Sequence, residues 1–472
     1  MTDLSRSGRE RSNGGRCRMK ATKGVALQRW GALGTVDNRK IFAAAAVVGV
    51  LAFAGKLAGM VRELLVAAFF GTGDAVDAYV LAWELPAYAI NVIAGAFAAA
   101  LIPAYVEVRD RDGSVAARQV LSGVMLFTLV LLVGASLLLA LVGPPFLSFV
   151  ASGFGPEKLA LTQRLLVLLL PCIVLSGLAT LLTGVLSADE HFVLGGASAL
   201  AVAACSIAAL LFGAHRWGIV ALAVGLVVGF AAQFAILTWG VARAGALPLL
   251  GWRQQAKAVR QVISQYLPMV VGMLLISSSG LVDQTMAATL GDGSAAVYSY
   301  SSRVIAVVLS VGTMALGTAV LPYFSRMVAA RDWTAIRHTL RTYTLLILGV
   351  TIPLSIGLIV CSRLIVRLLF ERGAFTASDT ATVGDIQAVL ALQIPFYSLG
   401  ILYVRLISSL KANQILMYGT VISFALNISL DYVLKERLGV PGIALATTIV
   451  YVVSTAYLAT MLSRLLKREM AA

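Results

Sequence analysis

The chain has 472 residues, of which 59% are hydrophobic and 12% are charged, and its formal net charge at pH 7 is +15. Soluble domains carry about 25% charged residues, so this composition excludes an ordinary soluble enzyme or binding domain. Apolar runs of roughly 20–30 residues recur along the chain, whereas membrane β-strands need only about 9–11 residues. Because only helices and closed barrels satisfy every backbone hydrogen bond in lipid, the sequence predicts an all-α polytopic membrane protein.

The first forty residues differ sharply from the rest of the chain. Residues 1–40 hold ten Lys and Arg residues against three acidic ones, and they lack the apolar segment of a signal peptide. Aromatic residues do not interleave with the basic ones in a way that suits nucleic acid, so no nucleic-acid partner is expected. We predict a basic, disordered cytoplasmic tail that lies near anionic membrane lipid.

About twelve transmembrane helices follow, each long enough to cross a bilayer. In chain order, we place them near residues 41–70, 77–105, 119–149, 159–187, 192–214, 217–241, 263–290, 295–322, 339–361, 383–410, 415–434 and 440–462. Prolines 86, 171 and 395 lie inside these spans, where proline commonly kinks a helix.

Lys and Arg residues indicate the orientation of the spans. They are enriched in the tail, in 106–118, 242–262 and 323–338, and in the C-terminal sequence RLLKRE, compared with the alternate loops, of which 362–382 is the most basic. We therefore predict a multi-pass protein of the bacterial cytoplasmic (inner) membrane with both termini in the cytoplasm.

The two halves of the chain are similar to one another. FGTGDAVDAYV at 70–80 is similar to LGDGSAAVYSY at 290–300, and a Pro-Tyr or Pro-aromatic helix exit follows in both halves. Equal six-helix repeats with the substrate path between them are one known transporter plan. We predict an N-terminal lobe at 41–241, a cytoplasmic linker at 242–262 and a C-terminal lobe at 263–465, arranged around a central cavity.

The sequence gives little support to enzyme chemistry. It contains no GxxxxGK[ST] phosphate-binding loop, its four cysteines show no CxxC spacing, and its three histidines have no partner at nucleophile or metal spacing. We therefore expect neither an enzyme nor a bound organic cofactor.

Ionisable side chains inside the spans are the most informative residues, because each costs roughly 2.5–3.5 kcal/mol at bilayer depth on insertion scales. In GKLAGMVRELLVAAFFG, Lys56 and Glu63 are seven residues apart and share a helical face. Arg62 lies on the neighbouring face, and Arg303 stands alone in the eighth span. Lys56, Arg62 and Arg303 would suit a cavity for an anionic substrate, with Glu63 as a pairing residue. The alternatives are that Arg62 and Glu63 snorkel to the outer interface and that Lys56 forms a structural ion pair.

Two further sets of polar residues lie in the spans. Asp77 and Glu84 are seven residues apart at the start of the second helix, so they share a face. Asp283 in the seventh span could meet Asn427 and Asp431, which are four residues apart in the eleventh, and a hydroxyl such as that of Thr447. Oxygen ligands of this kind select hard cations, so we expect a site for a monovalent cation or a proton, with an interfacial position for Asp431 as the alternative.

Several segments resemble a known family. GKLAGMVRELLVAAFFGTGDAVDAYVLAWELP, GTAVLPYFSRM and especially ERGAFTASDT (371–380) are similar to sequences of the MurJ/MviN lipid II flippases, within the multidrug/oligosaccharidyl-lipid/polysaccharide exporter superfamily. The resemblance covers roughly residues 41–465. It implies alternating-access transport of undecaprenyl-pyrophosphate-linked saccharides, and association with enzymes of cell-envelope polysaccharide synthesis.

The resemblance also implies roles for individual residues. Arg62, Asp77 and Arg303 match functional positions of the family's central cavity, and Lys56 stands where the family usually has arginine. Asp283, Asn427, Asp431 and Thr447 match positions that bind Na⁺ in some members, and Ile443 matches a backbone-carbonyl contributor. Na⁺ and H⁺ remain alternatives for the coupling ion.

The sequence departs from the family pattern in two places. PAYAINVIAGAF lacks the charged residues that usually follow the proline of the second helix, and about twelve spans are found where the family usually has fourteen. The expected substrate is lipid II or a related lipid-linked saccharide, and these departures favour a related one, such as an exopolysaccharide or O-antigen precursor, over lipid II itself. A cation-coupled multidrug exporter and a non-transporting membrane scaffold are the alternative functions.

Overall fold

The computed structural model describes residues 50–471 apart from 52, 152, 190 and 250–254, and none of the described residues forms a strand. Residues 55–472 form one compact unit, and every contact reported below lies within that unit. The predicted tail at 1–40 and the first part of the span predicted at 41–70 lie outside the described residues.

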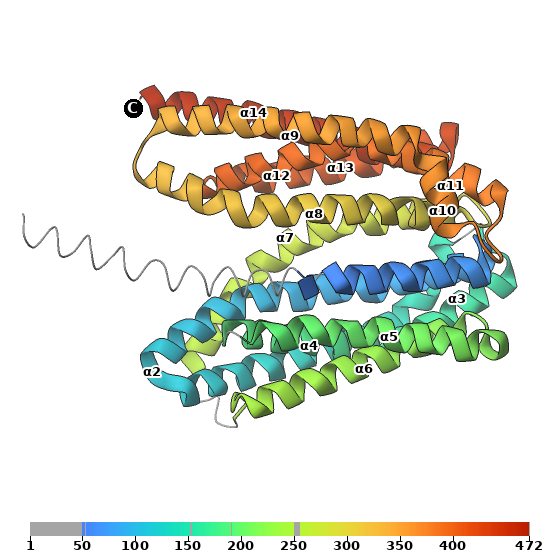
Figure 1. Ribbon diagram of the computed structural model, residues 1–472. Helices are drawn as coiled ribbons and strands as arrows, with labels where there is room; N and C mark the ends of the chain where they lie inside the picture. The colour runs from blue at the N-terminus through green and yellow to red at the C-terminus, as the bar shows by residue number, and fades with distance from the viewer. Residues whose placement is uncertain (1–49, 52, 152, 190, 250–254, 472) are drawn as a thin grey trace, which may run out of the picture. The chain divides into compact units, whose positions relative to one another are not determined.

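The described chain is helical almost throughout, which confirms the all-α membrane fold (Figure 1). After a helix that ends at residue 70, the helices are α2 (Asp74–Val150), α3 (Pro156–Leu169), α4 (Pro171–Ala188), α5 (Phe192–Trp217), α6 (Val220–Arg243), α7 (Ala256–Ala288), α8 (Ser294–Ala329), α9 (Trp333–Val360), α10 (Ser362–Phe370), α11 (Ala377–Ala391), α12 (Ile394–Ser409), α13 (Asn413–Leu438) and α14 (Val440–Ala471).

Eight helical segments of the described chain are long and apolar enough to cross a membrane. One of them, α2, contains two of the predicted spans, and the segments 156–188 and 377–409 each combine two shorter helices. The twelve predicted spans are consistent with these helices.

Glycine and proline explain where the helices break. Gly113 has φ +87° and is the non-helical residue inside α2. The predicted loop at 106–118 is therefore helical on both sides of a break at Gly113. Pro171 begins α4 directly after α3, as proline at a first helical turn allows. Pro86 does not interrupt α2. The predicted loop at 362–382 is more ordered than expected, because it contains α10 and the start of α11.

The apolar core shows how the two halves meet. One cluster combines residues of both halves, such as Val66, Tyr300 and Phe370, at the end of the helices where residues 71–73 and 289–293 lie. At the opposite end the core is divided into two clusters, one around Phe97 and the other around Phe324. The halves are therefore joined at the first end and packed separately at the other. Following the orientation predicted from the Lys and Arg residues, we name the first the outer end and the second the inner end.

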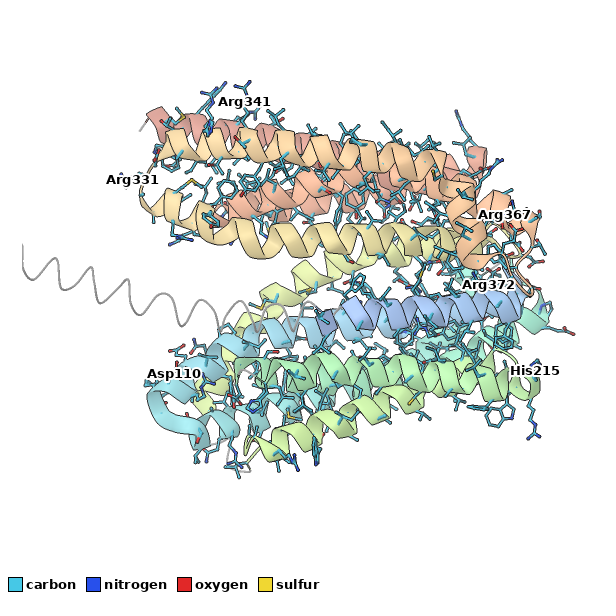
Figure 2. All side chains as sticks on the ribbon, in the orientation of Figure 1. Asp110, His215, Arg331, Arg341, Arg367 and Arg372 are labelled. Carbon is cyan, nitrogen blue, oxygen red and sulfur yellow. The ribbon has the colours of Figure 1, made fainter. Side chains whose placement is uncertain are left out.

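Helix α7 links the two groups of helices (Figure 1). Its first half packs on α2, where Tyr266 stacks on Phe97 with ring centroids 3.7 Å apart, and its second half contacts α13 through Asp283. Charged side chains gather at both helix ends: Figure 2 shows Asp110, Arg331 and Arg341 at the inner end and Arg367 and Arg372 at the outer end.

Candidate functional site

A cavity of about 170 Å³ brings together the intramembrane cations predicted from the sequence. Lys56, Arg62 and Arg303 all line it, together with Glu63 and four small or apolar residues. Lys56, Arg62 and Glu63 come from the first described helix and Arg303 from α8. The cavity therefore lies between the two halves of the chain, as the sequence predicts.

Glu63 is the acidic member of this group. Its Oε1 accepts a hydrogen bond from the Arg62 guanidinium at 2.6 Å and lies 3.8 Å from an Arg303 nitrogen. Only 14% of the Glu63 side chain is exposed, against 44% of the Arg303 side chain. The prediction that Glu63 pairs with the cations is confirmed, and one carboxylate faces three cations, so the cavity has an excess of positive charge.

The acidic cluster lies in the second half of the chain. Asp283 of α7 accepts hydrogen bonds from Asn427 of α13 at 3.0 Å and from Thr447 of α14 at 3.2 Å. The Thr447 hydroxyl also lies 3.1 Å from the Ile443 carbonyl oxygen. Tyr298 of α8 donates a further hydrogen bond to Asp283 at 2.6 Å, and the sequence analysis did not single it out.

Asp431 completes this cluster in an unusual way. It has no exposed surface, and neither of its carboxylate oxygens accepts a hydrogen bond from a donor group among the described residues, while the carboxyl group of Asp283 lies within hydrogen-bonding reach. The Asn427 Oδ1 also lacks a hydrogen-bond partner among the described residues. An unpaired buried carboxylate is costly unless it binds a proton or a cation. The donor set of two carboxylates, an amide and a hydroxyl therefore fits a hard monovalent ion or a proton. No group of three or more His, Cys, Asp or Glu side chains suited to a metal occurs in the described part of the chain.

Asp77 lies elsewhere, in a polar contact at the outer end. It is fully buried and accepts hydrogen bonds from the backbone N–H groups of Gly293 and Ala296, at 2.5 and 2.6 Å. These groups begin α8, so Asp77 caps a helix of the other half of the chain. It does not line the cavity of Arg62 and Arg303, in contrast to the position that the resemblance implies.

Lys158 joins this contact, and sequence reasoning missed it because it is the last residue of the predicted loop between the spans at 119–149 and 159–187, where it looks like an ordinary interfacial lysine. Its Nζ lies 2.7 Å from Asp77, 2.8 Å from Asp74 and 3.1 Å from Asp292. Lys158 holds the pKa of the Asp292 carboxyl below its usual value of about 3.9. This ion pair is therefore complete above that value and is lost as the pH falls through the lowered pKa. We call Asp74, Asp77, Lys158 and Asp292 the outer latch.

The loop at 371–376 closes the outer end beside the latch. The Ala374 N–H donates to the Ala68 carbonyl at 2.8 Å, and the Tyr300 hydroxyl donates to the Gly71 carbonyl at 3.1 Å. Gly71 and Gly373 have φ of +60° and +63°, and a Cβ on Gly373 would collide with the Ala68 oxygen. The close approach of two backbones therefore explains why glycine stands at positions 71 and 373.

Glu84 is separated from Asp77, although the two share a helical face. It lies inside α2 opposite α7, where its Oε1 is 3.7 Å from the position that a Cβ on Gly280 would take. One turn further along, the Tyr88 hydroxyl is 3.0 Å from the Ser278 hydroxyl. The two acidic residues thus lie in different contacts between α2 and the second half of the chain.

The family comparisons agree with the resemblance seen in the sequence. A family model described as "Lipid II flippase MurJ" matches residues 66–471. A probable lipid II flippase MurJ of Thermotoga maritima is 27% identical over 86% of this chain and 82% of its own length. Another from Rhizobium meliloti is 28% identical over 85% of this chain and 76% of its own length.

The structural comparisons support the same fold. A structure described as "Lipid II flippase MurJ, inward closed conformation" matches with a TM-score of 0.73 and 22% identity, covering 89% of this chain and 87% of that one. An inward-facing transporter of the MATE family, from the MOP superfamily, matches with the same TM-score and 11% identity, covering 91% and 99%. Identities this low show a shared fold alone.

Proposed function

Because the chain belongs to the lipid II flippase MurJ family, we propose that it moves a polyprenyl-pyrophosphate-linked saccharide, lipid II in the first instance, across the bacterial cytoplasmic membrane. The observation that carries the proposal is the cavity between the two halves, where Lys56, Arg62 and Arg303 face a single carboxylate. A cationic cavity at this position suits a diphosphate and disfavours an organic cation.

The cavity would hold the charged group of the substrate and not the whole molecule. Its volume of about 170 Å³ is smaller than the roughly 300–1,000 Å³ of pockets that enclose drug-sized ligands. The guanidinium groups of Arg62 and Arg303 can form bidentate hydrogen bonds with phosphate oxygens, whereas Lys56 supplies a point charge. Glu63, which now pairs with both arginines, would compete with the diphosphate and favour its release.

We further propose that a cation or proton drives the alternation between inward-open and outward-open states. Asp283, Asn427, Asp431, Thr447 and the Ile443 carbonyl would hold Na⁺, or Asp431 would hold a proton. The Asp431 oxygens, which accept no hydrogen bond from a donor group among the described residues, support this assignment. An ion can shift the balance between two states only if it binds them with different affinity, and α7, α13 and α14 all contribute to the cluster.

A leaflet assay tests the transport proposal against its main alternative, a cation-coupled drug exporter. The purified protein is reconstituted into liposomes with fluorescent lipid II, and an impermeant reductant measures the label in the outer leaflet. We expect accessible label to increase relative to protein-free liposomes, and we expect no ethidium transport in parallel vesicles. Ethidium transport without lipid translocation would contradict the proposal, and absence of both activities would favour a membrane scaffold.

A further inference from the structure

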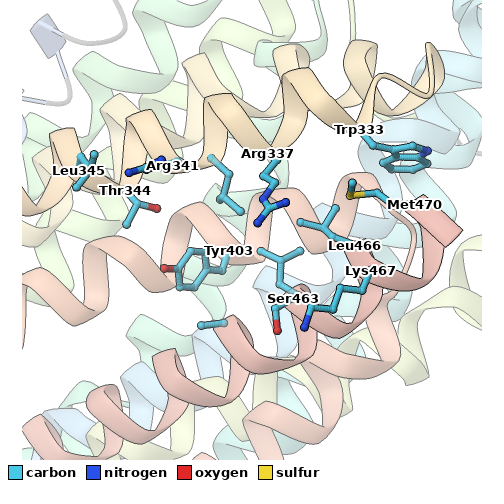
Figure 3. Close-up of a pocket in the computed structure, with 13 residues that line it drawn as sticks. Trp333, Arg337, Arg341, Thr344, Leu345, Tyr403, Ser463, Leu466, Lys467 and Met470 are labelled. Atoms are coloured by element: carbon cyan, nitrogen blue, oxygen red, sulfur yellow. The ribbon is translucent and has the colours of Figure 1, made fainter.

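A second groove lies at the inner end of the second half of the chain, between α9, α12 and α14 (Figure 3). Its volume is about 560 Å³. It shares no lining residue with the cavity of Arg62 and Arg303. It is therefore a separate site, and the proposed transport cycle does not use it.

The groove combines three cations with an apolar floor. Arg337 and Arg341 project from α9 and Lys467 from α14, and no acidic residue lines the groove. Figure 3 shows Arg337 directed into the space between α9 and α14. Within the part of the chain that the structure describes, none of the three cations forms an ion pair.

Apolar residues extend the groove away from these cations. Leu462 and Leu466 of α14 form a buried floor, with 2% and 8% of their surface exposed. Leu345, two turns beyond Arg337 on α9, is 60% exposed and marks the rim of the groove. The groove thus offers positive charge at the helix ends and an apolar surface along the bundle, which is the order of groups in a phospholipid.

We propose that this groove binds an anionic phospholipid of the inner leaflet. The phosphate would lie among Arg337, Arg341 and Lys467, and an acyl chain would follow Leu345, Leu462 and Leu466. Basic pockets between helices on the cytoplasmic side of membrane proteins bind anionic headgroups, and arginine pairs bind phosphate in a bidentate manner. The basic residues 1–40 of the same chain are excluded as the occupant, because their charge has the same sign as that of the groove.

Native mass spectrometry of the purified full-length protein tests this proposal, with dioleoyl-phosphatidylglycerol as the probe. Each cation near a membrane surface contributes about fivefold to the binding of anionic lipid, so an R337Q/R341Q variant should bind roughly 25-fold more weakly. Dioleoyl-phosphatidylcholine should bind the wild type and the variant equally. R337K/R341K should retain most of the binding.

The matched control is R464Q/R468Q, which removes two cations from α14 that do not line the groove. It should bind phosphatidylglycerol like the wild type, and all variants should have the same thermal unfolding profile. Equal losses in both double variants, or no loss in R337Q/R341Q, would overturn the proposal. The proposal would also be overturned if R337Q/R341Q lost the binding of polyprenyl pyrophosphate and kept the binding of phosphatidylglycerol, because the groove would then be a site for the transported lipid.

Discussion

At the residue scale, the charged groups inside the membrane belong to different contacts, and the spacing of residues in the sequence predicts only some of these contacts. Lys56, Arg62 and Arg303 meet as predicted, because an ionisable group in an apolar span needs a polar cavity. The position of Asp77 was not predictable from spacing, because its partner Lys158 is 81 residues away. Spacing predicts that two residues of one helix share a face, but it does not predict which other helix packs against that face.

Replacement of Asp431 by Asn tests the ion site. Asn keeps the size of the side chain and removes the charge, so a cation should bind this variant at least about tenfold more weakly, given the strength of charge-assisted contacts in buried sites. We expect a Na⁺ or proton gradient to stop accelerating lipid translocation. The measurement is the initial rate in the leaflet assay with and without each gradient.

Asp385→Asn is the control for this variant, because Asp385 is an exposed carboxylate that pairs with Arg363 outside the cluster. It should respond to the gradient like the wild type. If Asp431→Asn retained the full response to the same gradient, the acidic cluster would not be the coupling site.

At the element scale, most helices follow directly from the length of the apolar runs, and the breaks follow from Gly113 and Pro171. The helix α10 was not predicted, because its nine residues form a short amphipathic segment inside a basic loop. The groove between α9, α12 and α14 was also not predictable, since its lining residues come from three different helices. Contacts between distant helices depend on packing, which a single sequence does not display.

The loop at 371–376 gives a prediction at this scale. Gly373→Val should destabilise the closed outer end by at least about 1–2 kcal/mol, because a β-branched residue at positive φ is strained and its Cβ would meet the Ala68 carbonyl. The measurement is the distance between spin labels at Glu157→Cys and Ser378→Cys, in a background whose native cysteines are Ser. We expect a second, longer distance to appear.

Gly349→Val is the matched control for the Gly373 variant. Gly349 lies in α9 with ordinary φ, and a Cβ there would meet no atom within 4 Å. The control should keep the distance distribution of the parent. An unchanged distribution in Gly373→Val as well would show that the close backbone approach does not hold the outer end closed.

At the scale of the unit formed by residues 55–472, the two halves share a core at the outer end and have separate cores at the inner end. The outer latch and the loop at 371–376 reinforce the closed end, and the cationic cavity lies between the halves. This arrangement is consistent with one state of a transporter that opens its two ends in turn. The sequence similarity between residues 70–80 and 290–300 predicts that the two lobes are repeats of one another. It does not predict which end of the protein is closed.

The central claim is that the cationic cavity carries the translocated diphosphate. The most direct test is the leaflet assay on Arg62→Ala and Arg303→Ala, with Arg363→Ala as the control, since Arg363 is exposed and pairs with Asp385 outside the cavity. Loss of one bidentate phosphate contact should reduce the translocation rate by at least about tenfold. We predict this loss for both cavity variants, with amounts in the membrane unchanged, and wild-type rates for Arg363→Ala. Wild-type translocation by both cavity variants would contradict the account.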